Sequence, residues 1–468
     1  HDVQVIGTSN NGNTPTSLVL SPSQGNKGSI NLNAKQLLIK DGAFVSAGTS
    51  SVGDGGNLII NAEDVQVVGK GGNNSGNNNL PYSSGLFTAT EKSSTGDAGK
   101  LIINAKRMLV QDEAYVSSAS NGKKNGGDLI IDTVRLQVQN GSSVLSGTYN
   151  AGTGGDLKIT ANSLLVEDRA RINAGTSGTG DAGNLTINSD IIQVRDKAQV
   201  SVESTGTGDA GILTLNSDSI RLNNDALLTA NTRNNKIDSD TEQATINIKS
   251  QELIMRRGSN IFTNATGENV VGGNINIDTD FLIANENSDI SANSENFRGG
   301  NVRIDALGVF GTQFRSQPTS QSDITATGAT ENSSGTVEVI TPKSDINSGL
   351  VELPTIPVET EIANACSTPG YAQSSFTITG KGSLPPSPFE PLTGRLNRTK
   401  LATLDEVGET KVQGRRSRIK KEETKIKQIV EAKGWVRTKD GEIILVAHVP
   451  KGKYSSPASA SKSCYERK

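Results

Sequence analysis

Residues 183–210 read GNLTINSDIIQVRDKAQVSVESTGTGDA, and the same pattern starts again at Gly211. The phrase that opens each copy is Gly-Gly or Ala-Gly, followed by a polar residue and alternating apolar residues, and it recurs along most of the chain. The second residues of five consecutive phrases lie 28 residues apart: Gly99, Gly127, Gly155, Gly183 and Gly211. A fixed period of this length is the sequence signature of a stacked repeat architecture.

Each repeat divides into three short segments with strand character. In this copy they are Leu185–Ser189, Ile191–Arg195 and Ala198–Val202, in which apolar and polar residues alternate. Such alternation, with many β-branched residues, is typical of half-buried strands. The segments predict an all-β fold, a right-handed parallel β-helix of about eleven coils. We expect the glycines between coils to supply φ angles that other residues avoid.

Stacking explains how a chain with only 33% hydrophobic and 3% aromatic residues can form a core. One coil cannot bury its apolar stripe, whereas stacked coils bury Leu, Ile and Val in continuous ladders. The outward position after each first strand is repeatedly polar, and we assign it no chemistry, because it fits a side-chain ladder and a solvated face equally well. The residues at this position are Asn61, Asn104, Asp132, Thr160, Asn188, Asn216, Asp278 and Asp305.

Two irregularities interrupt the period. The interval from Gly56 to Gly99 is 43 residues, and the extra residues include the Gly- and Asn-rich run Gly71–Tyr82. Around Ala244 the glycine of the phrase is lost. Because insertions in repeat proteins map to loops on one face, we expect Gly71–Tyr82 to project as a loop from one corner.

Composition divides the chain into three parts. Residues 1–341 form the repeat rod, residues 342–362 a Pro-containing linker, and residues 363–468 a separate C-terminal domain. The first residues, Asp2–Ile6, resemble the second strand of a coil whose first strand is missing. We therefore expect the rod to be N-terminally truncated and the chain to be the C-terminal part of a longer protein.

The C-terminal domain is basic and the rod is acidic. Residues 363–468 hold 20 Lys and Arg against 10 Asp and Glu, whereas residues 1–362 hold 26 against 39. The densest basic run is Arg415–Lys421. It lacks interleaved aromatic residues and a surrounding binding motif, so we interpret it as a tail that is solvated or contacts an anionic surface. No nucleic-acid partner is expected.

Two further features mark this domain. The alternating segments Glu431–Arg437 and Glu442–Ala447 flank an Asp-Gly pair, which predicts a β-hairpin with Trp435 as its packing anchor. The only cysteines, Cys366 and Cys464, bracket the domain. They form either a disulfide that closes a long loop in an oxidising, exported setting, or two free thiols.

A phrase in the C-terminal domain resembles a known family. Residues 374–388 read SSFTITGKGSLPPSP, which is similar to the C-terminal signature of filamentous-haemagglutinin-like large exoproteins. In that signature a cysteine precedes Phe-x-x-Thr-Gly-Arg-Gly-Gly-Leu-Pro-Pro and a Gly-Trp-Val follows. Cys366 matches the cysteine, while Lys381 and Ser383 replace the usual Arg and Gly. The matching residues are Phe376, Thr379, Gly380, Gly382, Leu384, Pro385, Pro386, Gly434 and Trp435.

The repeats of residues 25–340 also resemble the passenger coils of this family. The resemblance implies two-partner secretion, in which a dedicated partner transporter exports the full-length protein through the outer membrane. It also implies an extracellular or cell-surface location.

The rod carries no recognisable catalytic motif. The only histidines are His1 and His448, which excludes a His-based triad inside the rod, and no nucleophile elbow, phosphate loop or Cys/His cluster is present. Acidic residues recur in the glycine-rich turns at Asp54, Asp97, Asp181 and Asp209. We prefer a turn-forming role for them over calcium binding, because the repeat is 28 rather than nine residues long. We therefore assign no catalytic, cofactor-binding or metal residues.

These observations favour a non-enzymatic, adhesin-like rod that is secreted or surface-exposed and presents an extended, repetitive binding surface. Its expected partners are the transporter and surface glycans or proteins of other cells. One alternative is a carbohydrate-active β-helix, a polysaccharide lyase or hydrolase with a carboxylate pair. A second alternative is a self-assembling component of a surface layer.

Overall fold

The computed structural model describes residues 1–8, 14–20, 28–74, 80–233, 244–342, 434–437 and 443–446. The chain divides into two units, His1–Val358 and Glu359–Lys468. In the described ranges the only helical element is the 3-10 turn η1 (Glu331–Ser333). Those ranges contain no helix that is long and apolar enough to cross a membrane.

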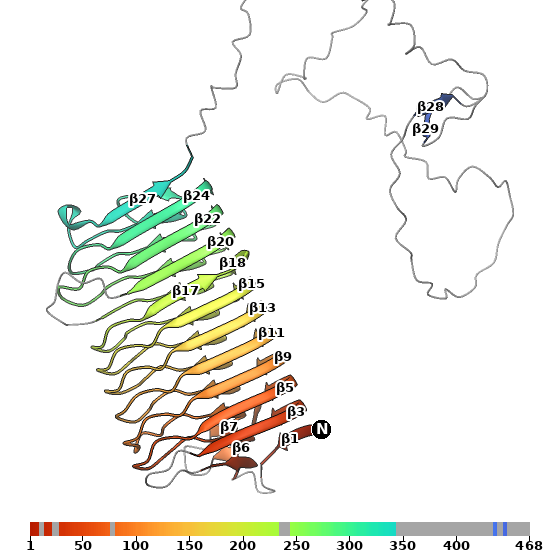
Figure 1. Cartoon of the computed structure of the whole chain (residues 1–468). Helices are drawn as coiled ribbons and strands as arrows, with labels where there is room; N and C mark the ends of the chain where they lie inside the picture. The colour runs from red at the N-terminus through yellow and green to blue at the C-terminus, as the bar shows by residue number, and fades with distance from the viewer. Residues whose placement is uncertain are drawn as a thin grey trace, which may run out of the picture. The chain divides into compact units, whose positions relative to one another are not determined.

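The first unit is a parallel β-helix, as the repeat predicts (Figure 1). Its long strands stack side by side in one parallel sheet in the order β1-β3-β5-β9-β11-β13-β15-β17-β20-β22-β24-β27, with β18 between β15 and β20. The bounds are β1 (Asp2–Ile6), β3 (Ser29–Lys40), β5 (Asn57–Val68), β9 (Leu101–Gln111), β11 (Leu129–Val138), β13 (Leu157–Val166), β15 (Leu185–Arg195), β17 (Ile212–Asn216), β18 (Ser219–Asn223), β20 (Thr245–Arg256), β22 (Asn274–Ala284), β24 (Asn301–Phe310) and β27 (Thr336–Ile340).

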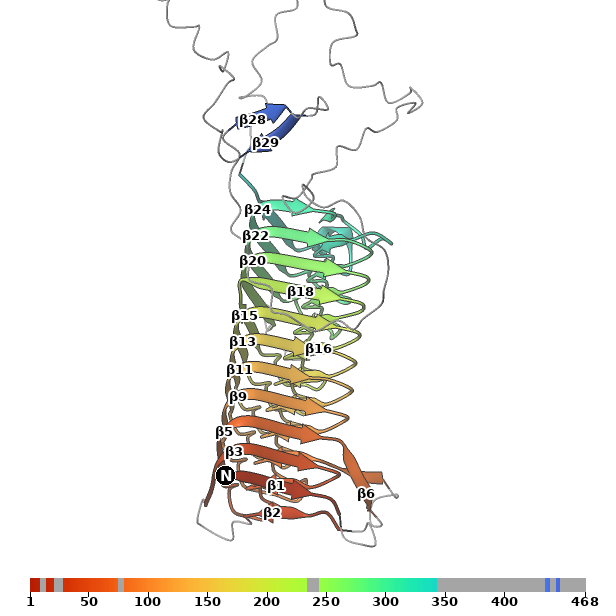
Figure 2. The same cartoon turned by 90° about the vertical axis from the view of Figure 1, so that its right-hand side faces the viewer.

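Short strands form a second parallel sheet on another side of the rod (Figure 2). Each of them follows a long strand of the same coil, so the chain passes from one sheet to the other in every repeat. The bounds are β2 (Ser17–Val19), β4 (Phe44–Ser46), β8 (Gly85–Phe87), β10 (Tyr115–Ser117), β12 (Ser143–Leu145), β14 (Arg171–Asn173), β16 (Gln199–Ser201), β19 (Leu227–Thr229), β21 (Asn260–Phe262), β23 (Ile290–Ser291), β25 (Gln313–Phe314) and β26 (Asp323–Thr325).

The first two strands predicted for each repeat are in most coils one bent strand. β15 covers both predicted segments, Leu185–Ser189 and Ile191–Arg195, and the predicted third strand is β16. The alternation of buried and exposed side chains is interrupted at Asp190 and Ile191, directly after the small and almost fully buried Ser189, and we call this position the bend. Because pairing with the next coil continues on both sides of the bend, no turn is needed there. Only in the next coil are the two halves separate, as β17 and β18.

The core consists of ladders of identical or similar side chains, as the stacking argument predicts. One ladder carries leucine in six successive coils, and its members are paired in register and no more than 1% exposed. Each such side chain contributes about 1.5–3 kcal/mol through burial. The ladder runs through Leu58, Leu101, Leu129, Leu157, Leu185, Leu213, Ile246, Ile275 and Val302.

The role predicted for the repeated glycines is wrong. Gly183 and its equivalents do not have positive φ; the positive-φ glycines include Gly42, Gly141 and Gly258, which lie elsewhere in the coil. A Cβ on Gly183 would lie 2.1 Å from the carbonyl oxygen of Gly155 in the preceding coil. The repeated glycine is therefore required because two backbones approach each other closely.

The insertion expected to be a loop contains strands. β6 (Lys70–Asn74) and β7 (Leu80–Ser83) pair antiparallel, so this stretch forms a hairpin beside the first coils of the rod (Figure 2).

In the second unit, β28 (Gly434–Arg437) pairs antiparallel with β29 (Ile443–Val446), with Trp435 opposite Leu445. This confirms the predicted hairpin. The side chain of Trp435 lies outside what the structure describes, as do most of the linker 342–362 and the two cysteines, Cys366 and Cys464.

Candidate binding grooves of the β-helix

The long strands in the middle of the rod end in two-residue corner turns in which both residues have positive φ. The φ angles are 53° and 62° at Asp168-Arg169, and 58° and 62° at Asp196-Lys197. Asp and Asn tolerate this left-handed conformation, and glycine, which stands second in one turn as Gly141, adopts it freely. Arg and Lys at the second position are therefore unusual.

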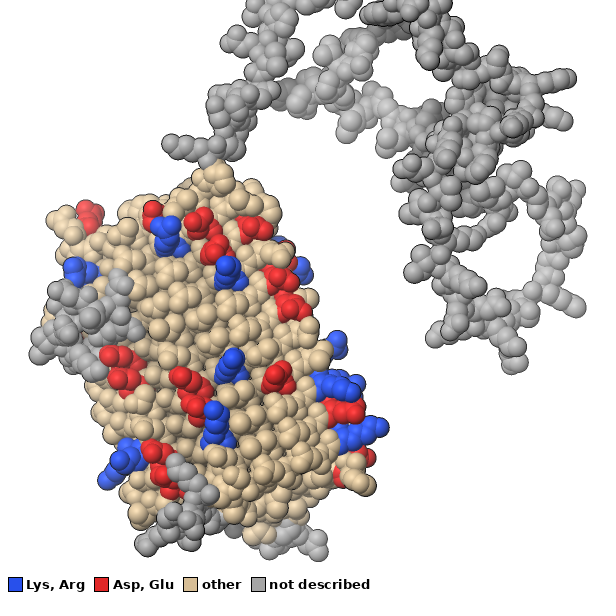
Figure 3. All heavy atoms as spheres, viewed as in Figure 1, with Lys and Arg blue, Asp and Glu red and all other residues tan. Residues whose placement is uncertain are grey.

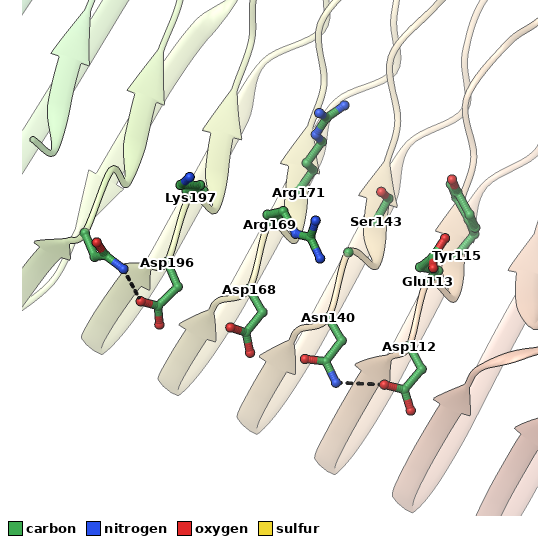
Figure 4. A pocket seen from close by; sticks show the side chains of 12 residues that line it. Asp112, Glu113, Tyr115, Asn140, Ser143, Asp168, Arg169, Arg171, Asp196 and Lys197 are labelled. Carbon is green, nitrogen blue, oxygen red and sulfur yellow. Dashed lines mark hydrogen bonds between the residues drawn. The ribbon is translucent and has the colours of Figure 1, made fainter.

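A groove with a volume of 1120 Å³ runs along these corners, and we call it the corner groove. Figure 4 shows that its side chains come from successive coils and form two rows. Because the coils stack in register, each row repeats at about 4.8 Å along the rod. The first row is Asp112, Asn140, Asp168, Asp196 and Asn224; the second row contains Glu113, Gly141, Arg169 and Lys197, with Tyr115, Ser143 and Arg171 beside it.

In the first row, amides of one coil bind carboxylates of the preceding coil. Asn140 Nδ2 donates to Asp112 Oδ1 at 2.7 Å, and Asn224 Nδ2 donates to Asp196 Oδ1 at 2.7 Å. Asp168 lies between these two pairs and is exposed to solvent. Its carboxylate has no hydrogen-bond or ion-pair partner within the described ranges, so it is available to accept a hydrogen bond from a ligand.

The second row carries most of the free charge. Glu113 forms an ion pair with Lys70. The side chains of Arg169, Arg171 and Lys197 are exposed, and no residue in the described part of the chain pairs with them. Charged side chains also gather along the edge at which the long strands end, the right-hand edge of Figure 3. The groove lining also includes the four carboxylates of Asp112, Glu113, Asp168 and Asp196. The three cations gather in the two coils of Arg169 and Lys197, and at those coils they attract an anionic group.

Two tyrosines lie in coils that precede these cations. Tyr115 lines the corner groove, and the side chain of Tyr149 is 50% exposed. Burial raises the pKa of Tyr149, Tyr115 raises it further, and the nearby Arg171 guanidinium lowers it. In the second sheet Tyr115 pairs with Ser143 and Ser143 with Arg171, so Tyr115 lies two coils before this cation, at one end of the groove (Figure 4).

A second groove follows the bend of the long strands and has a volume of 730 Å³; we call it the bend groove. Buried small residues such as Ala161 and Ser189 form its floor. Polar residues on either side of the bend form its walls. The lining residues from its middle coils are Asp132, Thr133, Val134, Thr160, Ala161, Asn162, Asn188, Ser189, Asp190, Asn216, Ser217 and Asp218, of which Val134 is an exposed apolar residue.

The predicted polar position forms one wall of the bend groove, and part of it is a ladder. Asn216 Nδ2 donates to Asn188 Oδ1 at 2.8 Å, and Asn104 Nδ2 donates to Asn61 Oδ1 at 2.8 Å. At these coils the ladder interpretation is confirmed. Opposite, Asn162 Nδ2 donates to Asp190 Oδ2 at 2.8 Å, so amide and carboxylate groups on both walls are oriented along the rod.

The aspartates of the glycine-rich turns connect adjacent coils. Asp54 Oδ1 accepts the backbone N–H of Asp97 at 2.9 Å, and Asp181 Oδ1 accepts that of Asp209 at 2.9 Å. Asp97 Oδ1 likewise accepts the N–H of Asn125 at 3.0 Å. This geometry supports the turn-forming role, because each carboxylate binds a backbone group of the next coil.

A smaller cavity of 290 Å³ near the last coils includes Asp278, Asp280 and Asp305. Asp278 pairs with Lys249 at 3.8 Å, and Asp305 pairs with Arg303 at 3.8 Å. Within the part of the chain that the structure describes, no group of three or more His, Cys, Asp or Glu side chains is placed to hold a metal ion.

The family-signature residues mostly fall outside the described ranges. These are Phe376, Thr379, Gly380, Gly382, Leu384, Pro385 and Pro386; only the backbones of Gly434 and Trp435 are described, in β28. Sequence reasoning did not predict the corner groove. The available signal was a polar pair between two strand segments that recurs at the repeat period, as in Asn140-Gly141, Asp168-Arg169 and Asp196-Lys197.

The fold and grooves together define the class of protein: a parallel β-helix with two grooves along its coils. A comparison with known proteins gives no match to any family model, curated protein or solved structure.

Proposed function

We propose that this chain is a secreted or surface-exposed, adhesin-like β-helical protein without a catalytic role, which presents an extended and repetitive binding surface. The observation that carries the proposal is the pair of grooves, each of which crosses several coils and repeats polar side chains in register. A surface of this kind suits a polymer or a dense array of surface groups better than a single small molecule.

The physical basis is multivalency. A polymer that lies along the rod meets similar polar groups at every coil, and each contact after the first is intramolecular. Many weak contacts then give a high total affinity, although each one remains exposed to water. The proposed partners are glycans or proteins on the surfaces of other cells. By the family resemblance, an outer-membrane transporter is the proposed partner for export.

The location is tested by protease digestion of the tagged protein, encoded in its full-length natural context, on intact and on lysed cells. Digestion on intact cells, or recovery from the medium, is the expected result. Protection until lysis would contradict surface exposure.

The binding role is tested with the purified full chain on beads, scored for retention of cells and of immobilised polysaccharides. Retention with the polysaccharide left intact is expected. The assay also measures newly formed reducing ends and unsaturated sugar products. These are the products that the carbohydrate-active alternative predicts, and the carboxylates of the bend groove are the groups that such an enzyme would use. Steady release of such products would overturn the non-enzymatic proposal.

A further inference from the structure

In the corner groove, residues with long side chains occupy the second position of the corner turn, where the backbone has a positive φ. The second residue of the corner turn is glycine in several coils, for example Gly42, Gly141 and Gly258, all with positive φ. In other coils it is Glu113, Arg169, Lys197, Asp225 or Asn287, at φ angles of 59–62°, and the two cations, Arg169 and Lys197, stand in adjacent coils. A long side chain in this conformation is strained, and strain retained at a surface position indicates a functional constraint.

The same two residues project into the corner groove, where no described residue forms an ion pair with them. Together with Arg171 they provide three exposed cations that have no ion-pair contact within the described ranges. Guanidinium groups bind planar carboxylates through two parallel hydrogen bonds, and an ammonium binds them as a point charge. Successive anionic groups about 4.8 Å apart along the rod would meet these cations coil by coil.

Two other groups define the remainder of the ligand. The unpaired Asp168 carboxylate only accepts hydrogen bonds when ionised, so the ligand must offer a hydroxyl or amine donor there. Tyr115, together with the half-exposed Tyr149 ring, presents an aromatic surface on which the C–H face of a sugar ring packs. Anionic groups, hydroxyl groups and sugar rings in one linear molecule describe an acidic polysaccharide.

We infer that the corner groove binds a linear polyuronate, a polysaccharide with one carboxylate on each sugar, which lies along the rod axis. Arg169, Arg171 and Lys197 bind its carboxylates, Asp168 accepts from its hydroxyls, and Tyr115 packs against a ring. The inference rests on the proposed function, since it names the ligand class of a surface to which that function assigns binding.

Carboxylate is favoured over sulfate because the site needs both anions and free hydroxyls. A polyuronate keeps its ring hydroxyls free, whereas heavy sulfation replaces them and leaves Asp168 facing further negative charge. A neutral glycan would leave the three cations unused.

The test measures binding of the full chain to immobilised polygalacturonate, with dextran and dextran sulfate as parallel surfaces. The chain is expected to bind polygalacturonate, with an affinity that falls as salt is added because the contacts are exposed charge pairs. The double variant Arg169→Gln/Lys197→Gln is expected to bind polygalacturonate about tenfold more weakly than the wild type. The matched control is Arg135→Gln/Lys158→Gln, which removes two exposed cations of neighbouring long strands outside the groove and should bind like the wild type.

A second variant separates binding from folding. Arg169→Gly/Lys197→Gly relieves the positive-φ strain and should raise the midpoint of urea unfolding while it loses binding. Higher stability with lost binding supports the inference, since a purely structural role would not give both changes.

Several outcomes overturn the inference: equal binding by the groove and control variants, binding to dextran sulfate alone, or no binding to polygalacturonate. Retention of cells by a chain that does not bind polygalacturonate would sink the ligand assignment and leave the proposed function intact. Binding of polygalacturonate by a protein that stays protected from protease in intact cells would support the ligand assignment and contradict the proposed surface location.

Discussion

A single methyl group at Gly183 is expected to disrupt the stacking of two coils. Its Cβ would lie 2.1 Å from the carbonyl oxygen and 2.7 Å from the carbonyl carbon of Gly155, and 3.1 Å from the carbonyl carbon of Gly154. All three atoms belong to the backbone, so no side chain can rotate away. To restore an ordinary contact, the two coils must move apart by about 1 Å. Overpacking of a dense interior costs about 1–3 kcal/mol, and we expect Gly183→Ala to cost about 3 kcal/mol.

The control is a glycine with the opposite properties. Gly69 has a φ of 78°, and no atom lies within 4 Å of the Cβ that an alanine would add there. Gly69→Ala therefore imposes left-handed strain without a clash, at a cost of about 1 kcal/mol.

The assay is urea unfolding of the full chain, followed by the circular dichroism of its strands. Because repeat proteins can depart from two-state unfolding, the midpoints are compared together with the slopes. Gly183→Ala should unfold at clearly lower urea than Gly69→Ala. The reverse order, or an unchanged Gly183→Ala, would refute the account in which close approach rather than φ selects the repeated glycine.

Three further predictions concern the core, one buried acid and one partly buried acid. Ile187 is fully buried and Ile191 is 43% exposed, so Ile187→Ala should lower the free energy of unfolding by about 2–5 kcal/mol. Ile191→Ala should lower it by less than about 0.5 kcal/mol, and similar losses in urea unfolding would contradict the assigned sides of β15. Asp323 is buried, pairs with Arg315, and accepts from Thr319 Oγ1 at 3.0 Å. Asp323→Asn should therefore cost about 3 kcal/mol and expose residues 312–322 to limited proteolysis, and an unchanged digestion pattern would count against this anchor. Burial is the largest cause that raises the pKa of Asp289. The folded state then binds this proton more tightly than the unfolded state, so this residue's contribution to stability falls as pH rises through the interval between the two pKa values. Asp289→Asn should remove that fall. The difference between the unfolding midpoints of the variant and the wild type should therefore shift in favour of the variant as pH rises, and parallel pH profiles would contradict this.

The sequence predicted the architecture because one physical requirement, burial of an apolar stripe, leaves a periodic trace. The Leu58-to-Val302 ladder follows from that trace alone. The role of the glycines could not be separated in the same way, because positive φ and close approach both select glycine. The backbone of Gly183, which lacks a positive φ, and its close approach to Gly155 of the preceding coil distinguish them. The bend at Ser189 was likewise hidden, since a small residue between two apolar runs fits a turn as well as a bend.

The corner groove was missed for a different reason. Asp168-Arg169 and Asp196-Lys197 contain no glycine, so neither pair carries a turn signal of its own. The equivalent pair 28 residues earlier, Asn140-Gly141, does carry one. Transferring that signal along the period would have placed every corner turn, and with it the row of second residues. Which carboxylates already accept a hydrogen bond still requires coordinates, because the contacts of Asp112 and Asp196 with amides of the next coil depend on side-chain geometry.

In a stacked rod, positions differ in how much variation they tolerate. Gly183 admits no side chain without a clash, whereas a Cβ on Gly141 meets only the flexible Cγ of Glu113, at 3.3 Å. Along the corner groove the second corner position can therefore change from coil to coil at the cost of backbone strain, whereas a Cβ on Gly42, beside the β6–β7 hairpin, would lie 2.6 Å from the carbonyl oxygen of Gly71. Along the corner groove this position reads Glu113, Gly141, Arg169, Lys197 and Asp225. The two cations are adjacent, whereas Glu113, paired with Lys70, and Asp225 stand in coils beyond them, so the attraction for an anionic polymer is concentrated at two coils. Ligand choice in such a protein then depends on the few residues that depart from the repeat, and those departures lie where the fold permits them.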